Sequence, residues 1–260
     1  MRIISWKHLS IITMLIIVAA TALASLPGRN QKDLQANENK LTQSANKSDS
    51  YPGPIVDYDA EQITGPVKPT DHTLRQIRSN RYNGRAPQPF GELPPDMRGF
   101  GISSDLTTLL PALPVKQSDA IVLGEVIDAK AYLSTDKTGV YSEFAIRIDD
   151  VLMDFTSSPI PFGTQIILER EGGVVRFSSG RLFQYAIYNQ GLPRNGQRYV
   201  FFLKNNEQGR IYSILTGYCL RKGRVSPLDK PEQFTAYEGA DETVFIHEIR
   251  EAITNRASSN

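Results

Sequence analysis

Hydrophobic and polar residues alternate along the second half of the chain with the period of two that is typical of β-strands. The clearest case is residues 141–152, in which Phe144, Ile146 and Ile148 alternate with charged or small residues. Residues 199–203 are apolar at every position, which predicts a strand covered on both faces. Further strands are predicted at residues 120–127, 164–170, 174–177, 182–188, 211–216, 218–220 and 224–225.

These strands predict a mainly β domain over residues 116–260. Gly124 and Gly217 stand inside predicted strands, where a glycine typically marks a bulge or bend that curls a sheet. Apolar residues at helical spacing predict a C-terminal α-helix over about residues 241–255. Six or more antiparallel strands with one helix predict a small OB-like β-barrel, and an open sandwich is the alternative.

The domain resembles netrin/TIMP-like OB domains in three segments. Residues 118–126 (SDAIVLGEV) and 141–152 (YSEFAIRIDDVL) are similar to their first strands, and residues 196–203 (GQRYVFFL) to a later one. The domain also resembles uncharacterised secreted bacterial proteins. The resemblance implies a β-barrel fold. It does not imply protease inhibition of the TIMP type, because that activity uses an N-terminal cysteine that this domain lacks.

Residues 25–115 have a different composition. They contain eleven of the 16 prolines, and residues 28–50 are polar with few apolar positions. Such a segment buries too little surface to offset the entropy of ordering, so we expect a disordered or extended proline-rich linker. One short helix is possible near residues 71–79, with Leu74 and Ile77 on one face.

The first 24 residues are typical of a secretory signal peptide. A basic start containing Arg2 and Lys7 precedes an uncharged stretch, and Ala22 and Ala24 fit the small-residue cleavage pattern. The alternative is an uncleaved anchor over residues 9–26, which is 18 uncharged residues long. Both readings place the domain outside the cytoplasm, in the periplasm or secreted, and only the second attaches it to a membrane.

Charge and cysteine content exclude some functions. The formal net charge is +1, from 29 basic and 28 acidic residues, so the chain has no broad basic surface for nucleic acid. A single cysteine excludes an intrachain disulfide and a cysteine-rich metal site. We therefore expect no nucleic-acid partner.

Two catalytic readings depend on a histidine. His247-Glu248 begins an H-E-x-x-H pattern, but position 251 is Glu251, so we expect an exposed helix residue and no metal site. Cys219 with His247 as base is a possible nucleophile. Its apolar β-strand context favours a buried, unreactive thiol.

Two carboxylate pairs are further candidates. Glu169 and Glu171 share one face of a strand, which is a possible acid/base or cation site, whereas Asp149 and Asp150 point to opposite faces. We expect solvated strand ends in both places.

A basic and aromatic set predicts a binding face. OB-like barrels bind chains across such surfaces by stacking and cation–π contacts. The set consists of Arg176, Arg181, Tyr185, Tyr188, Arg194 and Arg198. The sequence therefore favours a non-enzymatic envelope module that binds a protein or glycan, without cofactor. A hydrolase using a carboxylate pair or Cys219/His247, and a membrane-anchored structural protein, are the alternatives.

Overall fold

The computed structural model describes residues 53–59, 69–86, 89–92, 100–101, 110–206 and 211–258. The predicted signal peptide, the alternative anchor at residues 9–26 and the polar segment 28–50 all lie outside these residues. Of the helices in the described ranges, none has the length and apolar character needed to cross a membrane.

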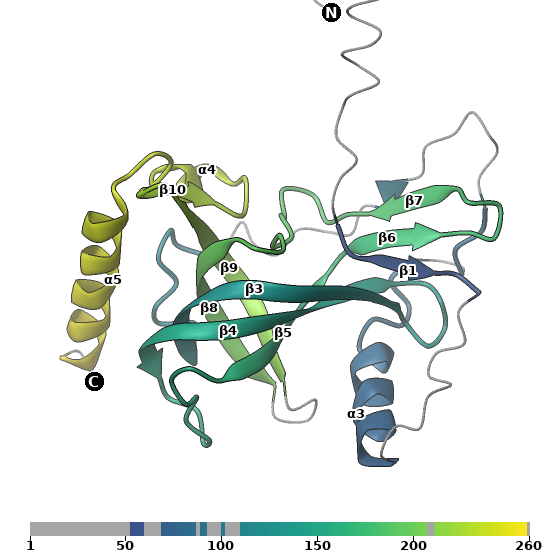
Figure 1. Ribbon diagram of the computed structural model, residues 1–260, viewed down its shortest axis with the longest axis horizontal. Helices are drawn as coiled ribbons and strands as arrows, with labels where there is room; N and C mark the ends of the chain where they lie inside the picture. The colour runs from purple at the N-terminus through teal and green to yellow at the C-terminus, as the bar shows by residue number, and fades with distance from the viewer. Residues whose placement is uncertain are drawn as a thin grey trace, which may run out of the picture. The chain divides into compact units, whose positions relative to one another are not determined.

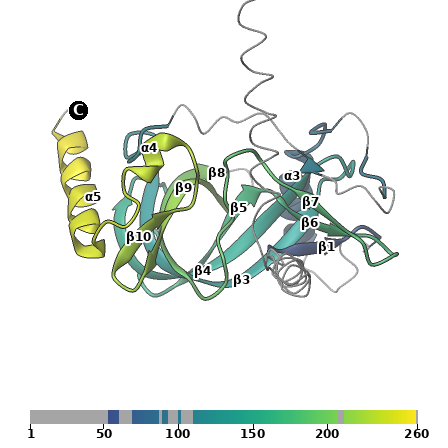
Figure 2. The same ribbon diagram turned by 90° about the horizontal axis from the view of Figure 1, so that it is seen from above.

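Five strands close into a ring in the order β3-β4-β5-β9-β8, because β8 pairs with both β9 and β3 (Figure 2). All neighbours in the ring are antiparallel except β5 and β9, which form a short parallel pair. This is an OB-like barrel, and the predicted mainly β fold is confirmed. The strands are β3 (Ala120–Leu133), β4 (Val140–Asp154), β5 (Gln165–Glu171), β8 (Arg198–Asn206) and β9 (Ile211–Arg221), with β10 (Arg224–Pro227) added beside β9.

Gly124 lies where β3 bends, as the sequence predicts. The register between β3 and β4 shifts between Leu123 and Gly124. A Cβ added at Gly124 would lie 2.6 Å from the carbonyl oxygen of Arg147. The bend therefore depends on the absence of a side chain at this position.

Strand β8 is covered on both sides, which explains its uninterrupted apolar sequence. Tyr199, Phe201 and Leu203 belong to the cluster that fills the barrel. Val200 and Phe202 belong to a second cluster on the outside, which the C-terminal elements cover. The prediction of a strand buried on both faces is confirmed.

The C-terminal helix α5 (Glu242–Ala257) lies against the outside of the barrel (Figure 1). Asp241 begins it, since its side chain accepts hydrogen bonds from the backbone amides of Thr243 and Val244. Phe245 and Ile249 are buried in the outer cluster, and the short helix α4 (Glu232–Thr235) contributes to the same cluster. The predicted helix at 241–255 is confirmed.

A second, four-stranded sheet has the order β1-β6-β7-β2. It packs on the part of the β3–β4 hairpin that extends beyond the barrel, around Leu133, Val140 and Val175 (Figure 1). The predicted strands at 174–177 and 182–188 form here and not in the barrel. The bounds are β1 (Ile55–Asp57), β6 (Gly173–Arg176), β7 (Leu182–Tyr185) and β2 (Phe100–Gly101).

The structure differs from the expected linker within residues 25–115. Beside β1 and β2 it contains helix α3 (Pro69–Asn80), close to the short helix that Leu74 and Ile77 suggest. Val56, Tyr58 and Phe90 join the apolar cluster beneath the second sheet. These residues are ordered by contacts with distant parts of the chain, which local composition does not reveal.

Candidate functional site

Three glutamates gather on the outer side of strands β4 and β5. Glu143 on β4 stands directly opposite Glu169 on β5, and Glu171 lies two residues farther along the same strand. Because side chains alternate along a strand, Phe144 and Leu168 point into the barrel while the glutamates point outward. We call the outer surface formed by Tyr132, Tyr141, Glu143, Glu169 and Glu171 the carboxylate face.

The carboxylate face is covered. Glu169 is fully buried and Glu143 is 8% exposed, whereas the Glu171 side chain retains 16% of its exposure. The expectation of solvated strand ends is therefore wrong for the Glu169/Glu171 pair, because another part of the chain lies over it. Burial raises the pKa of Glu169, although Arg81 and hydrogen bonds from Ser213 oppose that shift.

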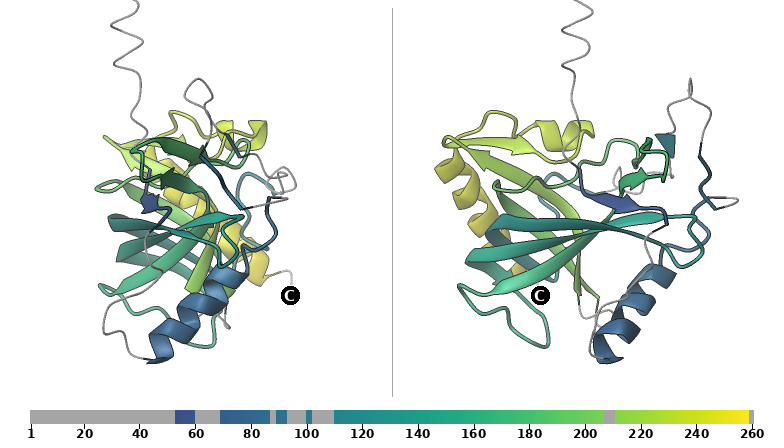
Figure 3. Two further views of the ribbon diagram at one scale, coloured as in Figure 1. Left: turned by 90° about the vertical axis from the view of Figure 1, so that its right-hand side faces the viewer. Right: turned by 45° about the vertical axis from the view of Figure 1, so that its right-hand side comes forward.

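The cover is helix α3 together with the turn that follows it, residues 69–86, which we call the arginine segment. Figure 3 shows α3 beside the β3–β4 hairpin. Arg75 and Arg78, three positions apart on the helix, both reach Glu143, at 3.6 Å and 3.1 Å. The last helical turn continues past Asn80 through hydrogen bonds from the amides of residues 81–83.

Two further arginines follow in this turn. Arg81 donates to Glu169 and forms an ion pair with it. Arg85 Nε lies 3.5 Å from Glu171 Oε1. Each of the three glutamates is thus paired with at least one arginine of the arginine segment, and Glu143 is paired with two.

Tyrosine rings complete the carboxylate face. The Tyr82 ring stacks on Tyr141 with centroids 4.7 Å apart and planes 9° apart, and Tyr132 stacks on the same ring at 5.5 Å. The Arg75 guanidinium lies 4.2 Å from the centre of the Tyr132 ring. Arg75 therefore combines a cation–π contact with a carboxylate contact, a combination that suits a guanidinium group.

The β3–β4 loop holds the end of the arginine segment. Asp136 Oδ2 accepts a 2.8 Å hydrogen bond from the Gly84 amide. Thr135 Oγ1 donates to Asn80 Oδ1 at 2.7 Å. Gly139 faces Tyr82 so closely that an added Cβ would lie 2.3 Å from the Tyr82 carbonyl oxygen.

The contact between the arginine segment and the barrel combines ion pairs with a buried aromatic contact, in which Tyr82 stacks on Tyr141. Leu74 and Ile77 are half-buried and belong to none of the three apolar clusters formed by the described residues. Within the same ranges, the buried Nε of Arg81 has no hydrogen-bond partner. A large share of charged contacts is typical of the interfaces between domains, which are more polar than a single hydrophobic core.

The structure does not bring the six predicted binding residues together on one surface. Arg176 and Arg181 lie in the second sheet and its hairpin, where they pair with Asp57 and Glu92. Tyr185 is 3% exposed, and its hydroxyl donates to Glu171 at 2.7 Å.

The remaining three lie elsewhere. Tyr188 is exposed in the β7–β8 loop, and the backbone amide of Arg194 donates to the Tyr199 hydroxyl. Arg198, on barrel strand β8, pairs with Asp149 and with Glu242 of α5. Four of the six thus use their side chains in contacts within the chain, with partners that local sequence does not reveal.

The sequence contains one local signal for the site. Arginines recur at positions 75, 78, 81 and 85, with spacings of three and four that place them along one side of a helix and its continuing turn. Glu143 gives no such signal, because a single glutamate in an alternating strand is ordinary. Its pairing with Glu169 follows only from the register of β4 and β5.

The catalytic alternatives find little geometric support. His247 is 71% exposed on α5, as expected, and its Nε2 lies 3.3 Å from Glu251 one turn away. Burial raises the pKa of the half-buried Cys219 thiol, which disfavours the nucleophilic thiolate. In the described ranges no three His, Cys, Asp or Glu side chains converge as a metal site would need.

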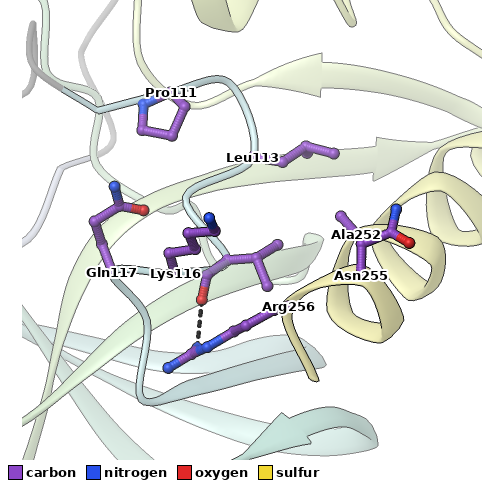
Figure 4. A pocket seen from close by; sticks show the side chains of 8 residues that line it. Pro111, Leu113, Lys116, Gln117, Ala252, Asn255 and Arg256 are labelled. Carbon is purple, nitrogen blue, oxygen red and sulfur yellow. Dashed lines mark hydrogen bonds between the residues drawn. The ribbon is translucent and has the colours of Figure 1, made fainter. Parts of the chain in front are cut away.

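A pocket of about 390 Å³ lies between residues 111–117 and the last turns of α5 (Figure 4). Its walls combine apolar groups such as Leu113 and Ala252 with Lys116 and Arg256. Arg256 Nη1 donates to the carbonyl oxygens of Val115 and Ser118, at 2.6 Å and 2.9 Å. Arg256 therefore fastens the loop to the helix, and we read the pocket as the seam between them.

No protein-family model matches the chain, and comparison with curated proteins finds no significant relative.

Proposed function

We propose that this chain is an exported, non-enzymatic binding module that holds a protein partner on the outer side of β4 and β5. The observation that carries the proposal is that this surface already holds a polypeptide, the arginine segment, through ion pairs to Glu143, Glu169 and Glu171. In OB-folds the face of the second and third strands, here β4 and β5, is the ligand surface for oligonucleotides and oligosaccharides, and we propose that a polypeptide uses it here.

A protein ligand suits this surface better than a glycan does. In the structure the Tyr132 ring contacts a guanidinium and the Tyr141 ring stacks on Tyr82, so the contacts that this surface makes are contacts with a polypeptide. Three carboxylates beside these rings match cationic side chains, and cationic side chains are supplied by polypeptides.

A hydrolase is less well supported by the same geometry. Acid/base catalysis needs a carboxylate that reaches substrate and exchanges protons. With the arginine segment in place Glu169 is paired with Arg81, and Glu171 also accepts a hydrogen bond from the Tyr185 hydroxyl, which does not belong to that segment. These contacts suit a binding surface better than a reaction centre.

Export rests on the N-terminal sequence. We propose cleavage after Ala24, with an uncleaved anchor at residues 9–26 and a structural role in the envelope as the alternative. Mass spectrometry of the exported chain distinguishes them: Ser25 at the N-terminus supports cleavage, and Met1 in the membrane fraction supports anchoring. The netrin/TIMP-like resemblance agrees with a binding role but names no partner.

In-cell photo-crosslinking tests the binding surface. Gln165 is exposed on β5, on the same outer side as Glu169 and about 13 Å from it along the strand, so a photoreactive residue there samples the surface next to the carboxylate face. Glu251, exposed on α5, is the matched control position. We expect a discrete protein adduct from position 165 and none from position 251. Equal labelling at both positions, or no protein adduct at 165, would contradict the proposal.

A further inference from the structure

We infer that the partner presents an arginine-bearing segment, and that residues 69–86 of this chain occupy its place until it binds. The inference rests on the proposed function and adds the chemistry of the ligand. The arginine segment then occupies the site in place of the partner, and the carboxylate face is a site that binds guanidinium groups.

The contacts of Glu143 and Tyr132 favour a guanidinium group by their chemistry. Glu143 receives two guanidinium groups, one of which also lies against the Tyr132 ring. A planar, weakly hydrated guanidinium forms both contacts at once, whereas an ammonium group is compact and more strongly hydrated. The carboxylate face therefore favours arginine over lysine.

The distances between the three glutamates match the distances between arginines along a helix. Glu169 and Glu171 are two residues apart on a strand, a separation of about 6–7 Å. Glu143 stands beside Glu169 on the neighbouring strand, about 5 Å away. Arginines three or four positions apart advance by about 5 Å along a helix, which long side chains readily match to this grid. The pattern fits a helical or turn segment better than isolated arginines.

The arginine segment can leave without dismantling the barrel. The clusters that fill the barrel and lie beneath α5 contain none of its residues. It is held by ion pairs, by hydrogen bonds to the β3–β4 loop and by the stacking of Tyr82 on Tyr141, and of its described residues only Ala86 at its end packs against the third cluster. The flanking Tyr58 and Phe90 are fixed in the third cluster, so a released segment would remain tethered at both ends.

The covalent attachment of the arginine segment lowers the affinity that we expect for an external peptide. A segment attached to its own site acts at an effective concentration of about millimolar, which a partner in solution must overcome. An external arginine-bearing peptide should therefore bind weakly to the intact chain, and more tightly once the internal segment is displaced.

The test uses the full chain and a fluorescent peptide with the sequence of residues 69–86, PTDHTLRQIRSNRYNGRA. An opened variant carries arginine-to-glutamine substitutions throughout the segment. These substitutions are Arg75→Gln, Arg78→Gln, Arg81→Gln and Arg85→Gln. Fluorescence anisotropy should show binding to the opened variant at least about 10-fold tighter than to the unmodified chain, and binding should weaken with salt.

Matched controls test the chemistry. A peptide with all four arginines replaced by glutamine should not bind, and one with lysines should bind several-fold more weakly. The opened variant with Glu143→Gln, Glu169→Gln and Glu171→Gln added should also lose binding. Near-UV circular dichroism checks that each variant keeps its fold. If the opened variant does not fold, Gly139→Ala displaces the segment with every charge retained, and it should bind the peptide likewise.

The outcomes separate this inference from the proposed function. No binding to any folded, opened chain, or equal binding of the glutamine peptide, would overturn the inference. A protein adduct at position 165 alongside that result would leave the proposed function standing. Tight peptide binding without any adduct in cells would support the guanidinium site and contradict the proposed surface for a cellular partner.

Discussion

Asp136 illustrates how one side chain orders a loop at the edge of the site. Partial burial by itself raises the pKa of Asp136, but hydrogen bonds from Ser134, Thr138 and Gly84 outweigh it and lower that pKa to about 2. Because this lies below the ordinary value of 3.8, the stabilisation is present above that value and is lost as the pH falls toward 2.

We therefore expect Asp136→Ala to lower the free energy of unfolding at pH 7 by about 1–2 kcal/mol, because solvent screens part of the effect at this partly exposed carboxylate. The difference from the unmodified chain should shrink as the pH approaches 2, which urea unfolding over a pH series measures. Asp128→Ala, at an exposed carboxylate, is the control and should change stability by less than about 1 kcal/mol. A pH-independent difference would rule out this account.

Asp229 is the second residue whose role follows from burial. Its side chain is fully buried and accepts hydrogen bonds from Arg170, Thr216 and the Gly191 amide. Asp229→Ala leaves the Arg170 charge buried without its partner, so we expect a loss of about 3–5 kcal/mol in the free energy of unfolding. Urea unfolding measures it. Asp150→Ala, which breaks an exposed pair with Arg250, should cost less than about 1 kcal/mol. Equal losses would contradict this ranking.

At the scale of elements, α5 provides a test of how the barrel is covered. Phe245 is 1% exposed and packs on Tyr218 and Tyr237, whereas the adjacent Val244 is 54% exposed. We expect Phe245→Ala to lower the free energy of unfolding by about 3–5 kcal/mol. Val244→Ala is the matched control and should change it by less than about 0.5 kcal/mol. Chemical denaturation measures both, and similar values would mean that α5 is not held by its apolar face.

Most barrel strands and α5 could be predicted from the sequence, because alternation, apolar runs and an N-capping aspartate are local signals. The alternation of Phe144 and Ile146 fixes which side of β4 faces inward. The site could not be predicted in the same way. Arg81 pairs with Glu169, 88 residues away, and Arg176 with Asp57, 119 residues away. Such pairs depend on the closed ring and on strand register, which arise only when the whole chain folds.

The region expected to be a linker shows the same limit. Proline content and the scarcity of apolar residues describe residues 25–115 on average. The structure of the described part depends on a few apolar residues and arginines within this range. Tyr58 and Phe90 anchor their segments in the third cluster, while arginines fasten α3 to carboxylates of the barrel. A row of arginines on a helix fits a solvated surface as well as a contact. Only the acidic surface opposite to it distinguishes the two.

At the scale of the whole molecule, the arginine segment covers one side of the barrel, and Gly139 offers a way to test whether this cover can be loosened alone. Its backbone accommodates any residue, but a Cβ would meet the Tyr82 carbonyl oxygen at 2.3 Å. Gly139→Ala should therefore push the arginine segment away from the β3–β4 loop and leave the barrel clusters intact. Gly196→Ala is the control, because Gly196 has no atom within 4 Å and lies in another loop.

Trypsin digestion measures the release of the arginine segment, because trypsin cleaves after arginine and acts on transiently released segments. We expect Gly139→Ala to raise the rate of cleavage after Arg75, Arg78, Arg81 and Arg85 by about 10-fold or more relative to Gly196→Ala, because cleavage follows the population of the open form. Mass spectrometry of the products gives the sites and rates. A protease-resistant barrel should remain after these cuts. Digestion that proceeds into residues 120–206 at the same rate would show instead that the arginine segment is an integral part of the fold.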